Sequence, residues 1–186
     1  MYLSVQPAKI ILISQQKEEA PMGLDMYLNA RKYLSKIDNT VLQANQELSY
    51  NSPEAVYPKF NDLMELTQLT DVATDIYGAS VEVTCAYWRK ANQIHAWFVR
   101  EIQGGEDNCG EYYVPQEKLI ELLALCKHAL ENKDPNLLPP QAGFFFGGTD
   151  IDEWYWNDIN NTISQLERIF ALPQIDSLSF YYNSSW

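Results

Sequence analysis

The polar residues of this sequence that could do chemistry lie mainly in its second half, among aromatic residues. Asn92 and His95 stand three residues apart in a segment with helical periodicity, which puts their side chains on one face of a helix. Trp88 and Arg89 precede them, where a strand gives way to this helix. An imidazole can act as a general base, and together with an amide it can orient a polar ligand. The structural alternative is that His95 packs in the core and hydrogen-bonds to Asn92.

Cys109 is a second candidate, in the glycine-rich acidic segment at residues 104–110. An exposed thiol becomes a nucleophile when a base or a positive charge lowers its pKa, and His95 is the available base. The neighbours of Cys109 are acidic and act in the opposite direction. The sequence has no Cys-x-x-Cys or His-x-x-x-His spacing, no phosphate-binding loop and no Gly-x-Ser-x-Gly motif. We therefore expect no metal and no cofactor, and the sequence leans away from an enzyme.

The end of the sequence forms a third candidate group. Its β-prone residues close on Ser184, Ser185 and Trp186, which predicts a strand that is tied into the fold. We expect the Trp186 ring to pack against the helix that carries His95, or against Tyr155. The two serine hydroxyls are expected to bond nearby backbone groups.

The charge of the sequence limits its partners. The net charge is −12, and residues 101–158 hold twelve acidic side chains against three lysines. Such a surface repels nucleic-acid phosphates and anionic lipids, so we expect neither as a direct partner. It fits a basic protein face, although an acidic surface also serves solubility alone. The carboxylates of this expected acidic partner face are Glu106, Asp107, Glu111, Asp150, Asp152 and Glu153. The last three also open a helix, where capping of free amides is the favoured interpretation, and the alternatives are binding of a divalent cation or an acid–base role.

Length and composition indicate one globular domain. A chain of 186 residues with 46% hydrophobic content can bury one substantial core. Three widely spaced cysteines favour the reducing cytoplasm, and no apolar run reaches the length of a membrane span. Residues 1–21 are either a translated leader or an extra strand. The leader is favoured because residues 17–19 can be encoded by a bacterial ribosome-binding sequence at normal spacing before Met22, so that residues 22–186 form the domain.

Hydrophobic periodicity predicts the elements that position these candidates. Alternating or short apolar runs predict strands at residues 24–30, 78–87, 144–146 and 178–184. Helical periodicity predicts helices at residues 53–68, 90–103, 115–130 and 149–172, the last with Thr149 and Asp150 as its N-cap. Residues 35–78 form a polar excursion around the first helix. The fold class expected is α+β, with three to four helices on a small antiparallel or mixed sheet, and mixed α/β is the alternative.

Several motifs occur together in a fixed order. They are Met-Gly-Leu-Asp-Met-Tyr-Leu at residues 22–28, Tyr-Trp-Arg-Lys-Ala-Asn-Gln-Ile-His at 87–95, Gly-Phe-Phe-Phe-Gly at 143–147, Asp-Glu with Tyr155 at 152–155, and a closing Tyr-x-Ser-Ser-Trp at 182–186. In this combination the sequence resembles an uncharacterised family of small bacteriophage and prophage proteins. The resemblance covers residues 22–186 except about 35–78. It implies no established reaction, and it agrees with Met22 as the start.

A phage origin favours proteins that bind and inhibit host factors. The leading hypothesis is a cytoplasmic protein that binds a host protein, such as a nucleic-acid-binding defence complex, through residues 101–158 in an anti-defence, anti-CRISPR-like role. The rival is a small-molecule or nucleotide site, with or without catalysis, around Trp88, Arg89, Asn92, His95, Tyr155 and residues 184–186. One deep pocket lined by these side chains favours the rival. Their dispersal into the core beneath a flat acidic surface favours the inhibitor.

Overall fold

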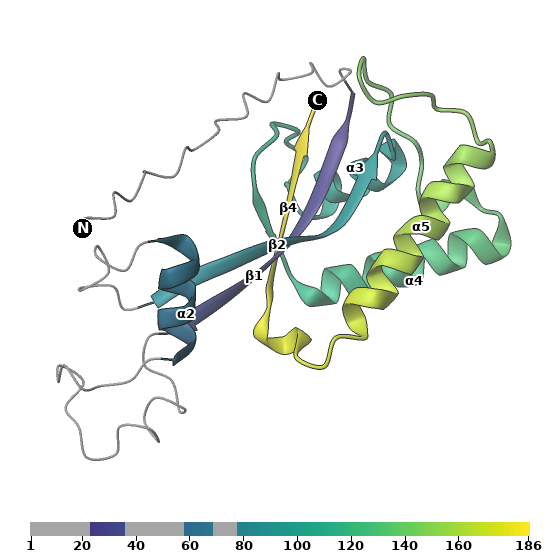
Figure 1. Cartoon of the computed structure of the whole chain (residues 1–186). Helices are drawn as coiled ribbons and strands as arrows, with labels where there is room; N and C mark the ends of the chain where they lie inside the picture. Colours follow the sequence, from purple (N-terminus) through teal and green to yellow (C-terminus); the bar gives the residue numbers. More distant parts are fainter. Residues whose placement is uncertain (1–22, 36–57, 69–77) are drawn as a thin grey trace, which may run out of the picture.

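The computed structural model describes residues 23–35, 58–68 and 78–186 of the chain (Figure 1). The strands are β1 (Asp25–Ser35), β2 (Gly78–Arg89), β3 (Tyr112–Val114) and β4 (Ser179–Ser185). The helices are α2 (Pro58–Thr67), α3 (Asn92–Glu101), α4 (Gln116–Asn132) and α5 (Glu153–Phe170). The four strands form one antiparallel sheet in the order β2-β1-β4-β3, which confirms the α+β class. The expected leader or extra strand at residues 1–21 lies outside the described residues.

The alternation of side chains along the strands separates a buried face from an open face of the sheet. Met26 and Leu28 of β1 and Phe180 and Tyr182 of β4 are buried, whereas the residues between them are more exposed. The helices α3, α4 and α5 lie on the buried side (Figure 1), so the core is the layer between these helices and the sheet. Trp88 of β2 belongs to this layer, which takes the indole into the core.

The open face of the sheet is polar and rich in tyrosine. Arg31 is at its centre, where its guanidinium bonds the carboxylates of Glu82 and Glu111 and lies 4.0 Å from the ring centroid of Tyr181. Beyond Arg31, β1 pairs with β2 alone, and the two strands continue toward α2 as a two-stranded arm (Figure 1). The candidate residues Trp88 and Arg89 lie at the opposite end of β2, just before α3.

Three expectations about local structure are wrong. Residues 144–146 form a turn rather than a buried strand, since Phe144 is 93% exposed, Phe145 is partly buried and only Phe146 is fully in the core. Gly147, at φ 88°, allows this turn. The strand β3 was not expected, because three residues are too few to show alternation. The N-cap of α5 is Asp152 rather than Thr149 or Asp150, and its carboxylate accepts a hydrogen bond from the amide of Tyr155.

The other helices and strands agree with the periodicity to within a few residues. The helices α3 and α4 fall within the segments expected at residues 90–103 and near 115–130. The helix α2 occupies the second half of the segment expected at residues 53–68. None of the described helices has the length and apolar composition that crossing a bilayer requires.

Candidate functional site

The first turn of α3 buries three polar side chains. Asn92 is 2% exposed, Gln93 is 3% exposed and His95 is fully buried. Buried polar groups destabilise a fold unless they are hydrogen-bonded, and each of these three bonds to a different part of the molecule. The start of α3 is therefore a polar junction inside the fold, which we call the α3 junction (Asn92, Gln93 and His95).

Asn92 holds the loop that precedes α5. Its Nδ2 donates to the carbonyls of Phe146 at 3.1 Å and Gly148 at 2.7 Å, and its Oδ1 accepts from the amide of Gln141 at 3.3 Å. Asn92 therefore satisfies three backbone groups of one loop, and it does not bond His95 as the structural alternative expected. This explains why the loop keeps a defined course without secondary structure of its own.

Gln93 connects the α3 junction to α5. Its Nε2 donates to the carbonyl of Tyr155 at 3.3 Å and to Oδ2 of Asp158 at 3.4 Å, which fixes the orientation of the amide. Its Oε1 accepts no hydrogen bond from any described residue. The buried amide of Gln93 thus keeps one acceptor available beside the carboxyl of Asp158.

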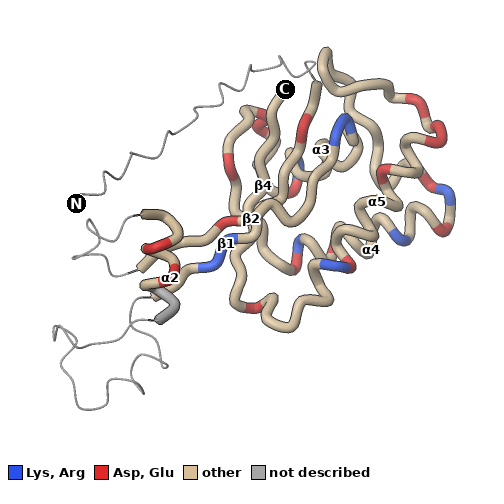
Figure 2. The backbone as a smooth tube through the Cα atoms, viewed as in Figure 1, with Lys and Arg blue, Asp and Glu red and all other residues tan. Residues whose placement is uncertain are grey.

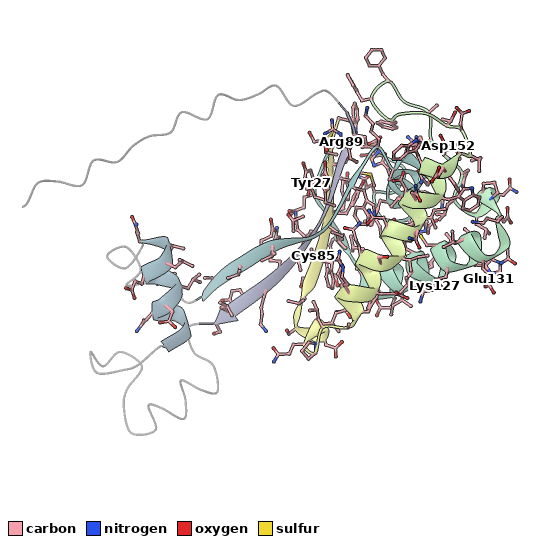
Figure 3. The ribbon with its side chains drawn as sticks, turned by 45° about the vertical axis from the view of Figure 1, so that its right-hand side comes forward. Tyr27, Cys85, Arg89, Lys127, Glu131 and Asp152 are labelled. Carbon is pink, nitrogen blue, oxygen red and sulfur yellow. The ribbon has the colours of Figure 1, made fainter. Side chains whose placement is uncertain are left out.

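A pocket of about 340 Å³ opens where β2 ends and where α3 and α5 begin. It is lined by Arg89, Lys90, Asn92, Gln93, Pro140, Gly147, Gly148, Asp150, Asp152, Trp154, Tyr155 and Asp158. Figure 3 shows Arg89 and Asp152 at this same end of the molecule, with Lys127 and Glu131 on α4 well below them. The volume is in the range of sites that hold small molecules.

The pocket has an acidic wall that lacks a basic partner. Burial raises the pKa of Asp158 to about 6, and the negative charge of Asp152 adds to this effect while the hydrogen bond from Gln93 opposes it. In the described part of the chain, no lysine or arginine forms an ion pair with Asp150, Asp152 or Asp158. Trp154 stands beside these carboxylates with 77% of its surface exposed.

Tyr155 supports this wall rather than offering a reactive group. Its hydroxyl donates to the carbonyl of Leu138 at 2.8 Å. Burial raises the pKa of Tyr155 to about 12, so the hydroxyl remains protonated at neutral pH. The side chain therefore fixes the start of α5 against the segment that follows α4.

His95 belongs to a second, separate network. Its Nδ1 lies 2.7 Å from the hydroxyl of Tyr182 and its Nε2 lies 2.9 Å from Oδ2 of Asp107. Because an ionised carboxylate only accepts, Nε2 carries a proton, and in the neutral imidazole the Tyr182 hydroxyl donates to Nδ1. Burial raises the pKa of Tyr182 well above its ordinary value, which keeps that hydroxyl protonated. The other carboxylate oxygen of Asp107 accepts from Nε1 of Trp186 at 3.1 Å.

The end of the sequence is tied into this network, but not as expected. The Trp186 ring lies edge-on to Phe146 at 5.8 Å and is 44% exposed, so its partners are Phe146 and Asp107 rather than Tyr155. The hydroxyl of Ser184 is buried and bonds no described residue, and Ser185 is exposed. The expectation that Ser184 satisfies a backbone group is therefore wrong.

The candidate binding residues do not form one site but fall into four groups: the pocket, the His95 network, the core and the exposed surface. Arg89, Asn92 and Tyr155 line the pocket. His95 and Trp186 meet at Asp107, as described above. Trp88 and Ser184 are in the core, where the Trp88 Nε1 donates to Thr162 Oγ1 at 2.9 Å, and Cys109 and Ser185 are exposed. Among the described residues, Cys109 does not bond His95, so the thiol–imidazole pair that the sequence left open is not formed.

The expected acidic partner face is divided as well. Asp107 bonds His95, and Glu111 bonds Arg31. Asp150 and Asp152 line the pocket. Glu106 and Glu153 are exposed without an ion pair to any described residue. Acidic residues are scattered along the backbone in Figure 2 rather than gathered on one element.

Among the lining residues that the sequence patterns do not single out, Gln93, Trp154 and Asp158 matter most to the pocket. Gln93 adjoins the candidate Asn92, and Trp154 lies between the candidates Glu153 and Tyr155. Asp158 lies one helical turn after Tyr155 on the same face of α5, and this spacing was the available signal. Only the structure brings α3 and α5 together.

The described residues contain no group of three or more His, Cys, Asp or Glu that could hold a metal ion. No family model, curated protein or solved structure matches this chain.

Proposed function

We propose that this protein binds a small polar molecule in the pocket between α3 and α5. The observation that carries the proposal is Asp158, a partly buried carboxyl that lines a pocket of about 340 Å³ and has no basic partner among the described residues. Burying a carboxylate without compensation destabilises a fold. Perturbed carboxyl groups in pockets are typical of ligand sites, where the ligand supplies the missing interaction.

The surrounding contacts support a preformed site. Asn92 fixes the loop that carries Gly147 and Gly148, and the cap formed by Asp152 fixes the start of α5. A site that is ordered before binding loses less conformational entropy when the ligand enters. The pocket therefore needs no large rearrangement to accept a molecule of matching size.

The test is to map where small molecules bind. Backbone amide NMR shifts of the uniformly ¹⁵N-labelled protein are recorded with a panel of single-ring polar fragments. We expect the perturbed amides to cluster at Gln93, Gly148, Trp154 and Asp158. Perturbations spread evenly over the surface, or an unperturbed pocket, would contradict the proposal.

A blocking variant provides the control. Gly148 lines the pocket, and a Cβ added there meets no atom within 4 Å, so Gly148→Trp can place an indole at the pocket without a backbone clash. Ala124→Trp adds the same group at an exposed position of α4. Fragment binding should be lost in Gly148→Trp and kept in Ala124→Trp.

A second candidate function is the binding of a basic protein. The observation in its favour is the exposed ring of Trp154, which follows Asp152 and Glu153 in sequence and lines the same pocket as Asp150. Exposed tryptophans often anchor protein interfaces, and carboxylates around them select basic partners. For a protein of phage origin this partner would be a host protein, and inhibition of a defence complex is the corresponding proposal.

The two candidates differ in their response to variants and to salt. For the protein partner, capture from bacterial lysate should be lost in the variant with Trp154→Ala and Glu153→Lys, and should weaken steeply with salt because the carboxylates are solvent-exposed. The Gly148→Trp variant should weaken fragment binding more than it weakens capture of the protein partner. A captured protein whose binding is the same at low and high salt would contradict the acidic partner face.

A further inference from the structure

We infer that the pocket takes an organic cation, an ammonium or guanidinium group, held between the carboxyl of Asp158 and the ring of Trp154. The inference rests on the proposed small-molecule site and adds the chemical class of its ligand. Three features of the pocket support it: its acceptors, its exposed ring and the placement of its basic residues.

The first feature is a pair of acceptors that the described residues leave largely unsatisfied. Asp158 receives one long hydrogen bond, at 3.4 Å from Gln93, and Gln93 Oε1 receives none from a described residue. Both residues line the pocket, and Gln93 is 97% buried with its amide fixed in orientation. An ammonium or guanidinium carries several N–H donors and no acceptor, so it matches this arrangement.

The second feature is the aromatic ring. Among aromatic side chains, tryptophan binds a cation over its ring face most strongly. Trp154 is among the most exposed large side chains of the described chain. Trp154 follows Asp152 and precedes Asp158 by one turn of α5, so the first turns of one helix present both carboxylates and the ring to the pocket. Carboxylates beside an aromatic ring form a common site for organic cations.

The third feature is the position of the basic residues. Arg89 and Lys90 line the pocket from the end of β2, where the amide of Lys90 donates to the carbonyl of Leu24 and its side-chain carbons lie against Gly147. Neither residue forms an ion pair with Asp150, Asp152 or Asp158 in the described part of the chain. The basic residues that line the pocket therefore leave these carboxylates to the ligand.

The test compares two molecules that differ in charge. Benzylamine is a cation at neutral pH, and benzyl alcohol has the same ring and nearly the same size without the charge. We expect benzylamine to perturb the NMR signals of Gln93, the Trp154 indole and Asp158, with a dissociation constant about tenfold below that of benzyl alcohol.

Variants assign this difference to Asp158. Asp158→Asn keeps the size of the side chain and should bring benzylamine to within about twofold of benzyl alcohol. Asp176→Asn, in the exposed turn before β4, is the matched control and should change neither constant. Should Asp158→Asn fail to fold, the wild-type protein answers the same question, because its preference for benzylamine should be present at pH 7.5 and lost at pH 5.

The source of the cation is tested with two guanidinium probes. Agmatine represents a free ligand, and the capped tripeptide acetyl-Gly-Arg-Gly-amide represents a side chain of a partner protein. Tighter binding of agmatine indicates a free molecule, and tighter binding of the tripeptide indicates a protein. Either result supports the cation site, provided that Asp158→Asn weakens it.

Three results would overturn the inference, and they are distinguishable. Equal binding of benzyl alcohol and benzylamine in the pocket would refute the cation while leaving the small-molecule site intact. Displacement of benzylamine by millimolar MgCl₂ or CaCl₂ would indicate an inorganic cation instead. No perturbation of the pocket by any probe would refute the proposed function and the inference together.

Discussion

At the scale of single residues, the most informative group is the carboxyl of Asp158. Burial raises its pKa from 3.8 to about 6, so the folded chain binds a proton here more tightly than the unfolded chain does. The stability that this group contributes is complete below the unfolded pKa and is lost as the pH rises through the folded pKa. At neutral pH Asp158 therefore destabilises the fold, as binding residues often do.

Because the ionised carboxyl destabilises the fold, Asp158→Asn should change the stability of the ligand-free protein. The variant should be more stable than the wild type at pH 7.5, by about 1 kcal/mol once screening by water at the open pocket is allowed for. This corresponds to a melting temperature about 2–4 °C higher. The difference should shrink as the pH is lowered from 7.5 to 4, as measured by thermal melting. A variant that is less stable at pH 7.5 would show that the carboxylate has a stabilising partner.

His95 illustrates the opposite case, a buried group with both ring nitrogens satisfied. Tyr182→Phe removes the hydroxyl that lies 2.7 Å from Nδ1 and leaves that nitrogen buried without a partner. We expect a loss of about 1–3 kcal/mol in the free energy of unfolding. Tyr113→Phe, an exposed tyrosine of β3, should cost less than about 0.5 kcal/mol in the same urea titration. Equal stabilities of the two variants would mean that the His95 network contributes nothing to the fold.

At the scale of elements, α3 determines the site. Its first turn holds the loop before α5 through Asn92, α5 through Gln93, and β4 through His95. Each of these three residues contacts a different segment. Substituting one of them should therefore destabilise the segment that it contacts more than the other two.

Asn92→Ala tests this directly. The substitution leaves the carbonyls of Phe146 and Gly148 and the amide of Gln141 without their partner. We expect a loss of about 2–4 kcal/mol in stability, and faster hydrogen exchange in residues 141–148 than in α4. Asn160→Ala, at an exposed position of α5, is the control and should leave exchange in this loop unchanged. Uniformly faster exchange over the whole chain would argue against a local role.

The packing of the helices and strands explains which of them the sequence could predict. Periodicity located β1, β2, β4, α3, α4 and α5, because a face buried against other elements leaves a repeating apolar pattern in each of them. It could not locate β3, which is held by pairing with β4, nor the turn at residues 144–146, whose course depends on Asn92. For the site, local patterns identified Arg89, Asn92 and Tyr155. The pairing of Gln93 with Asp158 joins residues 65 positions apart, which no local pattern encodes.

At the scale of the whole molecule, the pocket joins segments that are distant in sequence. The end of β2, the loop after residue 140 and the start of α5 meet only when the sheet and helices are assembled. A ligand that binds the assembled pocket and not the unfolded chain must therefore stabilise the entire fold.

This linkage predicts a thermal shift. Benzylamine at ten times its dissociation constant should stabilise the protein by about 1.4 kcal/mol, which raises the melting temperature by about 3–6 °C. The shift should be absent in Gly148→Trp and present in Ala124→Trp. A shift of the same size in both variants would place the binding site elsewhere.

The most direct test of the central claim, that the pocket between α3 and α5 is a ligand site, is a crystal structure of the wild-type protein soaked with the single-ring fragments. We expect difference density to recur in this pocket, with amines within hydrogen-bond distance of Asp158 and Gln93 Oε1 and beside the ring of Trp154. Fragments that bind only at other places, or a loop at residues 141–152 that closes the pocket in every crystal, would contradict it.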